Sequence, residues 1–191
     1  MYICIYAGHC RYARTLKEVE MGPLSNFEQY GLMPPLDLVR CDNAHPVWKT
    51  AGVLDAIICD PPYGVRAGAR KTGARQDKLP KPIPEEHRAT HIPGTVGYGI
   101  GEVMMDLLNF AVKYLRTGGR LCYWLPTTSE YSEHDLPAHP AMRLAYNCED
   151  VLSLKLSRRL ITMVKDRDAA PGPRLHHSLL TLCPQALTHA T

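Results

Sequence analysis

Four consecutive residues, Asp60, Pro61, Pro62 and Tyr63, carry the groups of this chain that are best suited to chemistry. The two prolines fix φ, lack N–H donors and push Asp60 out of the helical region, so the backbone here is stiff and extended. The Asp60 carboxylate and the Pro61 carbonyl then form a rigid pair of hydrogen-bond acceptors. Such a pair suits an exocyclic NH₂ group, because binding both protons directs the nitrogen lone pair toward an electrophilic methyl group. We therefore predict methyl transfer to a planar amine, with these four residues as the catalytic set.

Tyr63 gives the same segment a flat aromatic face. A base taken out of its stack can rest on such a face, which contributes about 1–3 kcal/mol. The alternative is a proline-rich turn with Tyr63 in the core, but an ionisable residue directly after a buried strand is costly unless it has a function or a partner. The acceptor pair alone does not choose among guanine N2, adenine N6 and a glutamine amide.

The composition is that of one soluble globular domain, with 191 residues, 45% of them hydrophobic and 21% charged. It excludes disorder of the whole chain. No apolar run reaches the roughly 18 residues of a membrane span, and the first ten residues lack the features of a signal peptide. We therefore expect an intracellular, cytoplasmic protein with no membrane partner.

Metal ligands are not indicated by the sequence. Seven cysteines form an odd set without a Cys-x-x-Cys pair, so neither a disulfide framework nor a zinc knuckle is predicted. Neither of two other groups supplies four ligands at a recognised spacing. These groups are Cys4 and Cys10 with His9, and the pair His176 and His177. We expect no metal site.

A basic cluster follows the proline pair. The formal net charge of +3 is too small to bind nucleic acid by itself, so any such binding requires a local cluster. The alternative is an ordinary solvated loop. Because the cluster adjoins the predicted base pocket, we predict a lid that contacts RNA phosphates, with Arg66, Arg70 and Lys71 binding substrate. Six cations face one acid, Asp77, within sixteen residues: Arg66, Arg70, Lys71, Arg75, Lys78 and Lys81.

Two predicted strands place acidic residues at one edge of a sheet. Residues 36–41 form a short strand that ends at Asp42, and residues 53–59 form an apolar strand, buried on both faces, that ends at Asp60. Strands alternate with helices and are followed by a hairpin, which predicts an open α/β sheet with one antiparallel strand at its end. Ligands of such sheets bind beyond the carboxyl ends of the parallel strands, so Asp42 and Asp60 mark the site.

The remaining elements are predicted from apolar periodicity and from helix and strand breakers. The clearest is a helix over residues 102–115 with one apolar stripe, followed by a strand over 120–125 that Pro126 ends. Residues 65–101, including the glycines around Tyr98, are predicted to be a long loop. The other predictions are a strand at 2–7, helices at 12–21, 25–30 and 140–146, and a hairpin of 151–156 with 160–164 that turns at 157–159.

The Asp60 segment resembles motif IV of S-adenosylmethionine-dependent amino-methyltransferases. The strings DAIICDPPYGVRAGARKTG, DLLNFA, LRTGGRLCYWLP and SRRLITM, in this order, are similar to the tRNA guanine-10 N2-methyltransferase family over about residues 26–165. The resemblance implies a Rossmann-like class I methyltransferase sheet, S-adenosyl-L-methionine as cofactor and methyl transfer to N2 of a tRNA guanine. It also implies that Asp42 contacts the cofactor's adenine, and that tRNA and a small zinc-binding activator protein, paired along the sheet edge, are partners.

One part of the family pattern is missing. Members order their strands 3-2-1-4-5-7-6 and carry an RNA-binding THUMP region, a first strand and a glycine-rich cofactor turn, none of which is found before Asn26. We therefore expect an incomplete sheet without its first two strands. The predicted organisation is an unassigned segment (1–25), the C-terminal part of the methyltransferase domain (26–165) and a loose tail (166–191). The alternative is a non-catalytic remnant that binds RNA or the activator.

Overall fold

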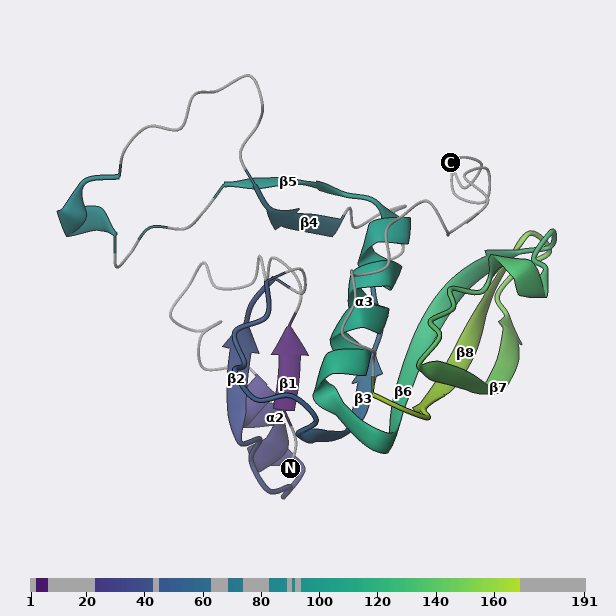
Figure 1. Cartoon of the computed structure of the whole chain (residues 1–191), viewed down its shortest axis with the longest axis horizontal. Helices are drawn as coiled ribbons and strands as arrows, with labels where there is room; N and C mark the ends of the chain where they lie inside the picture. The colour runs from purple at the N-terminus through teal and green to yellow at the C-terminus, as the bar shows by residue number, and fades with distance from the viewer. Residues whose placement is uncertain are drawn as a thin grey trace.

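The computed structural model describes residues 3–6, 23–42, 45–62, 69–73, 83–88, 91 and 94–168. The predicted helix at 12–21 and most of the predicted tail lie outside these residues. No helix among them is long and apolar enough to cross a membrane. The elements (Figure 1) are β1 (Ile3–Tyr6), α2 (Pro23–Gln29), β2 (Asp37–Arg40), β3 (Leu54–Cys59), β4 (Ala69–Thr72), β5 (Thr95–Tyr98), α3 (Ile100–Tyr114), β6 (Leu115–Thr128), β7 (Met142–Val151) and β8 (Leu156–Lys165), with short 3-10 helices at Glu85–His87 and Glu133–Asp135.

A four-stranded mixed sheet in the order β3-β6-β8-β7 forms the body of the molecule. β3 and β6 are parallel, whereas β8 is antiparallel to both of its neighbours, β6 and β7. A parallel pair followed by an antiparallel hairpin confirms the α/β mixed sheet expected from the sequence.

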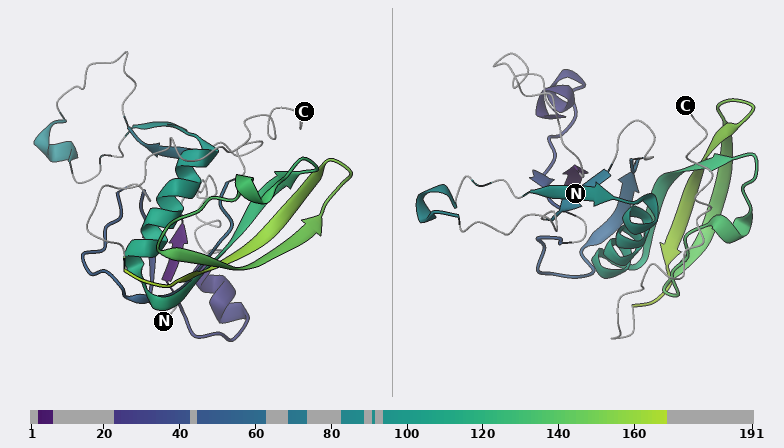
Figure 2. Two further views of the ribbon diagram at one scale, coloured as in Figure 1. Left: turned by 45° about the vertical axis from the view of Figure 1, so that its right-hand side comes forward. Right: turned by 90° about the horizontal axis from the view of Figure 1, so that it is seen from above.

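Helix α3 covers one face of this sheet (Figure 2). Its inner side is buried against alternate residues of β6, so that Leu108 is 1% exposed and Leu121 is fully buried. The rings of Trp48, Phe110 and Tyr114 pack together beside this core, and the Tyr114 hydroxyl donates to the Trp48 carbonyl at 2.9 Å. The predicted apolar stripe is confirmed, since all of its members are buried: Val103, Met104, Leu107, Leu108, Ala111, Val112 and Leu115.

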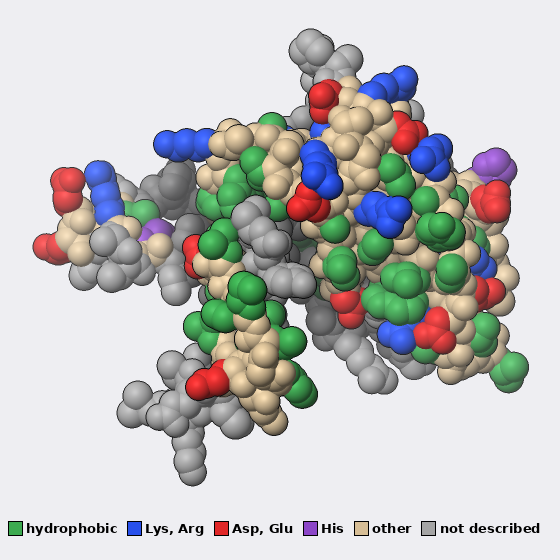
Figure 3. Space-filling model, turned by 90° about the horizontal axis from the view of Figure 1, so that it is seen from below, with side chains coloured by type: hydrophobic (Ala, Val, Ile, Leu, Met, Phe, Trp, Pro, Cys, Tyr) green, Lys and Arg blue, Asp and Glu red, His purple; other side chains and the backbone are tan. Residues whose placement is uncertain are grey.

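The other face of the sheet is not covered by a described element. Ile58 of β3 is 83% exposed, although Leu54 and Ile57 of the same strand are buried against α3. The prediction that this strand is buried on both faces is therefore wrong, because α3 shields only one side. Tyr146 on β7 is likewise 64% exposed, and Figure 3 shows hydrophobic side chains remaining at the surface seen from below.

The C-terminal hairpin is real, but its strands lie elsewhere than predicted. Residues 142–151 form β7, so the predicted helix at 140–146 is wrong, and the turn lies at 152–155, not at 157–159. Arg158 and Arg159 lie inside β8, directly opposite Asp150 and Glu149 of β7. They form ion pairs of 2.8 and 3.2 Å with these carboxylates, which stabilises the observed register.

Strand β6 continues past Pro126 to Thr128, so Pro126 does not end it as predicted. The last residue of β6 paired with β3 is Tyr123, opposite Cys59. At Pro126 the strand therefore has a described neighbour only in β8, and a residue without an N–H is tolerated where one side of the strand is unpaired.

Two smaller sheets flank this body. β1 and β2 pair in parallel, which confirms the short strands predicted at 2–7 and 36–41. α2 begins at Pro23, before the start of the helix predicted at 25–30, and Gly31 follows it with φ of 61°. β4 and β5 pair in an antiparallel ribbon, so the prediction of an irregular loop over 65–101 is wrong for these two segments. The pairing joins residues that are more than 20 positions apart, and it leaves no local signal in the sequence.

Candidate active site

The proline corner lies at the carboxyl end of β3. Asp60 is exposed, Pro61 is buried and Pro62 is half-buried, so the backbone of the corner is packed while its carboxylate reaches the surface. The Asp60 side chain is therefore accessible, whereas Pro61, whose carbonyl is the second predicted acceptor, is buried. Tyr63 and Arg66, the predicted base-stacking and substrate-binding residues, lie outside the described residues.

Two ionisable side chains at this end of β3 and β6, Cys59 and Tyr123, are neutral at neutral pH. Burial, the charge of Asp60 and the neighbouring thiol of Cys122 raise the pKa of Cys59 to about 12. Burial also raises the pKa of Tyr123, the residue opposite Cys59, far above its usual value. Both groups stay protonated at neutral pH, and Asp60 is close enough to Cys59 for the carboxylate charge to act on its thiol.

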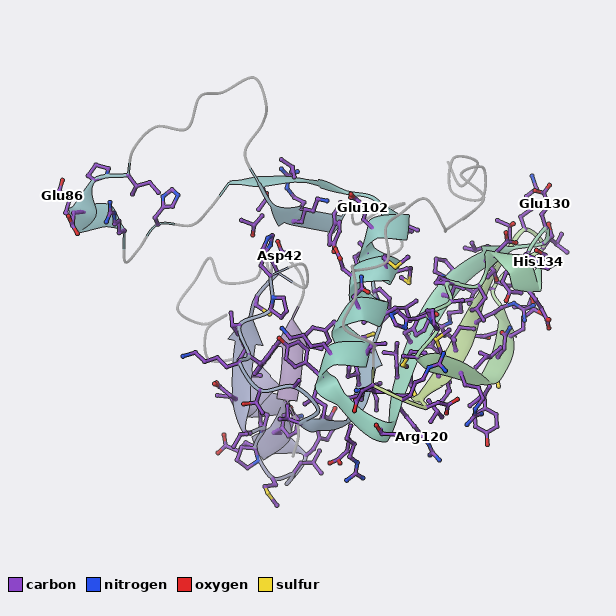
Figure 4. All side chains as sticks on the ribbon, viewed as in Figure 1. Asp42, Glu86, Glu102, Arg120, Glu130 and His134 are labelled. Atoms are coloured by element: carbon purple, nitrogen blue, oxygen red, sulfur yellow. The ribbon has the colours of Figure 1, made fainter. Side chains whose placement is uncertain are left out.

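Asp42 follows β2 and lies against the β4–β5 ribbon. Its Oδ2 accepts the Thr72 N–H at 2.8 Å and lies 3.5 Å from Nδ1 of His45. The side chain is only 11% exposed. The predicted cofactor residue therefore also joins the end of β2 to β4, and Figure 4 shows its side chain directed toward the ribbon.

The ribbon packs on the N-terminal turns of α3. Lys71 Nζ forms an ion pair of 2.8 Å with Glu102 Oε1, and it lies 5.2 Å from the centre of the Tyr98 ring. The Tyr98 hydroxyl donates a hydrogen bond to the Asp106 carboxylate. Burial, followed by this hydrogen bond, raises the pKa of Tyr98 far above its usual value, so the phenol keeps its proton.

The predicted substrate-binding cations on the ribbon differ in orientation. Arg70 is exposed, and its Nε and Nη2 donate to Oγ1 and the carbonyl of Thr95, each at 2.7 Å. Lys71 is half-buried and turned toward α3. The structure therefore brings Asp42 and Lys71 to the ribbon's inner side, and leaves Arg70 at the surface.

Sequence reasoning missed three polar residues at this place: Tyr98, Glu102 and Asp106. The signal available was the spacing of the two acids, since residues four apart share one face of a helix. Glu102 also caps α3, because its Oε2 accepts the Gly99 N–H at 3.2 Å. In the described part of the chain, no group of His, Cys, Asp and Glu could hold a metal ion.

Comparison with known proteins relates the chain to one group of enzymes. No protein-family model matches it. It is 46% identical over 151 residues to "tRNA (guanine(10)-N(2))-methyltransferase TRMT11" of Dictyostelium discoideum, an alignment that covers 78% of this chain and 30% of that protein. The mouse protein of the same name is 43% identical over 157 residues, which cover 81% of this chain and 34% of the mouse protein. The human protein is 46% identical over 145 residues, which cover 74% of this chain and 31% of the human protein.

The chain thus spans about a third of the length of the curated relatives that it matches. Identity above 40% over three quarters of the chain reflects common descent. The resemblance inferred from the Asp60 segment and the strings around it is confirmed: this chain is related to the tRNA (guanine(10)-N(2))-methyltransferase family.

Proposed function

We propose that the chain is the C-terminal part of the catalytic domain of a tRNA guanine-N2 methyltransferase that uses S-adenosyl-L-methionine. The observation that carries this proposal is the Asp60 corner at the carboxyl end of a parallel strand, in a chain that is related to such enzymes. The two prolines that follow Asp60 stiffen the backbone there and support the same reaction.

The strand order supports a class I methyltransferase sheet. The order β3-β6-β8-β7, with only β8 antiparallel, agrees with the 4-5-7-6 end of the order 3-2-1-4-5-7-6 that the resemblance implies. The parallel pair β2-β1 suits the 3-2 end of that order, and β1 lies between β2 and β3 (Figures 1 and 2). We therefore propose that the sheet is short of one strand, between β1 and β3, rather than of its first two.

The corner's own groups perform the acceptor chemistry in this proposal. The Asp60 carboxylate and the Pro61 carbonyl accept hydrogen bonds from the two N–H groups of guanine N2, which turns the nitrogen lone pair toward the methyl donor, and the carboxylate takes up the proton that the methylated amine releases. Tyr63 stacks on the base and prevents its rotation. S-adenosylmethionine, when bound, supplies a methyl group on a positively charged sulfur. Asp42 fits the adenine end of this cofactor, since a mostly shielded carboxylate can accept hydrogen bonds from an exocyclic amine.

The proposed partners are tRNA, which contacts the ribbon and the basic segment around it, and a small zinc-binding activator protein along the sheet edge. The second candidate is a non-catalytic remnant that binds RNA or the activator. It is favoured by strand β3, which among the described residues has a neighbour on one side only and leaves Ile58 83% exposed.

Methyl transfer from labelled S-adenosylmethionine to unmodified tRNA tests the proposal. We expect Asp60→Ala to lower the rate at least about a hundredfold while tRNA affinity is unchanged, because the amine loses a charged acceptor. Asp55→Ala is the matched control, since Asp55 is an exposed carboxylate on the same strand. Turnover by Asp60→Ala at the wild-type rate would contradict the mechanism.

Calorimetry separates the two candidates. Saturable binding of S-adenosylmethionine, lost in Asp42→Ala, supports the enzyme. Binding of tRNA without any binding of the cofactor supports the remnant.

A further inference from the structure

The β4–β5 ribbon is fastened to the rest of the molecule by carboxylates. Asp42 accepts the Thr72 N–H, Glu102 pairs with Lys71, and Asp106 accepts the Tyr98 hydroxyl. A two-stranded ribbon of four residues a strand is not stable by itself in water. Among the described residues, these three contacts join its side chains and backbone to Asp42 and α3 and help to fix its position.

The register of the ribbon divides its side chains between two faces. Lys71 lies opposite Val96 and Arg70 lies opposite Gly97. Successive side chains of a strand point to opposite sides, so Lys71 and Tyr98 share the face that meets α3, while Arg70 belongs to the other. The inner face is therefore occupied by contacts with α3, and the outer face is exposed.

The hydrogen bond from Tyr98 to Asp106 depends on the phenol proton. Burial raises the pKa of Tyr98 far above its usual value, so the phenol keeps this proton at neutral pH. The Lys71–Glu102 pair is about two-thirds shielded from solvent, with side chains 29% and 32% exposed, so salt screens it less than a surface pair.

We propose that Glu102 and Asp106 are positioning residues for RNA, which hold the ribbon so that its outer face, with Arg70, meets the phosphate backbone. The inference rests on the proposed function and adds to it that two acidic residues promote the binding of a polyanion. Lys71 then holds the ribbon on α3 through its ion pair with Glu102, and it is not a phosphate ligand.

Two variants test this proposal. Tyr98→Phe breaks the bond to Asp106 without changing any charge, and Glu102→Gln weakens the ion pair while keeping an acceptor for the Gly99 N–H. We expect each to weaken the affinity for an unmodified tRNA transcript about fivefold and to raise KM without changing kcat. We also expect a smaller salt dependence of binding, since fewer phosphates are contacted.

For Glu102→Gln, the direction of the change in tRNA affinity distinguishes a positioning role from simple charge repulsion. Removing an acid from an RNA-binding protein normally tightens binding, because a repulsive charge is lost. The matched controls are Glu130→Gln, which makes the same charge change at an exposed residue, and Tyr146→Phe, which removes the hydroxyl of an exposed tyrosine on β7. We expect both controls to bind tRNA at least as tightly as the wild type.

The outcomes separate the two proposals. Wild-type or tighter tRNA binding by both Tyr98→Phe and Glu102→Gln overturns the positioning role alone. Weaker binding together with a lowered melting temperature and a lowered kcat also overturns it, because the variants would then be generally destabilised. If the wild-type chain does not bind tRNA, the proposed function and this inference both fail.

Discussion

The four-stranded sheet and the β4–β5 ribbon are held in place by different forces. The sheet packs apolar residues against α3, and Leu115, Leu121 and Ile161 are fully buried there. The ribbon has intermediate and exposed residues, and carboxylates fasten it. Burial contributes about 25 cal/mol per Å² of apolar surface, whereas one intramolecular hydrogen bond contributes only about 0.5–1.5 kcal/mol. The sheet therefore sets the global stability, and we expect the ribbon to open locally without unfolding the sheet.

The largest expected effect is in the sheet. We predict that Leu121→Ala lowers the free energy of unfolding by about 2–5 kcal/mol, because it leaves a cavity at a fully buried position of β6. Urea unfolding measures this loss. The control is Leu154→Ala, whose side chain is 98% exposed and whose effect should stay within about 0.5 kcal/mol. Equal stabilities of the two variants would mean that the sheet is not the core.

A polar contact inside the sheet should have a smaller effect. Lys165 is 3% exposed, donates to the Leu115 carbonyl at 2.7 Å and pairs with Asp168 at 2.8 Å. We predict that Lys165→Met costs about 1–3 kcal/mol, because a buried carbonyl loses its donor. Asp168 is 84% exposed, so Asp168→Ala should cost less than about 1 kcal/mol in the same denaturation assay. A larger loss in Asp168→Ala than in Lys165→Met would reverse this assignment.

The hairpin that completes the sheet should lose stability in mild acid. Burial lowers the pKa of His139 below its usual 6.5, and its Nδ1 accepts the Ala141 N–H at 3.0 Å just before β7. The unfolded chain then binds a proton at higher pH than the folded one. The contribution of neutral His139 to the free energy of unfolding is fully present above about pH 6.5, and it is lost as the pH falls through the lower folded-state pKa. Melting temperatures from pH 7.5 to 5.5 should fall more steeply for wild type than for His139→Gln, and parallel profiles would exclude this source.

The smallest effect on global stability is expected for the ribbon. We predict that Asp42→Ala speeds hydrogen exchange of the Thr72 amide at least about tenfold, because the ribbon opens locally without unfolding the sheet. The free energy of unfolding should change by less than about 1 kcal/mol. Asp37→Ala is the control, since this exposed carboxylate at the other end of β2 contacts only its neighbour Leu38 among the bonds described here. Loss of global stability in Asp42→Ala would make the ribbon part of the core.

Predictions from local patterns succeeded for features that depend only on residues close together in the sequence. The apolar stripe of α3 and the corner after β3 could both be identified from the residue order, because each depends on neighbours within a few positions. The hairpin was placed in the wrong register because Arg158 and Arg159 resemble turn residues until their partners on β7 are known. The ribbon was missed because β4 and β5 are joined only by pairing across a long connection.

By itself the amino-acid sequence predicted the chemistry proposed for the Asp60 corner, and it determined the family resemblance and the helix that covers one sheet face. These features follow from fixed backbone angles at proline and from the repeat of apolar residues along a helix. Only the tertiary structure decided that Lys71 faces α3, that Arg70 faces outward and that Asp42 joins β2 to the ribbon. Orientation of this kind depends on which distant segments pair, and it is therefore a property of the folded chain rather than of any local stretch of residues.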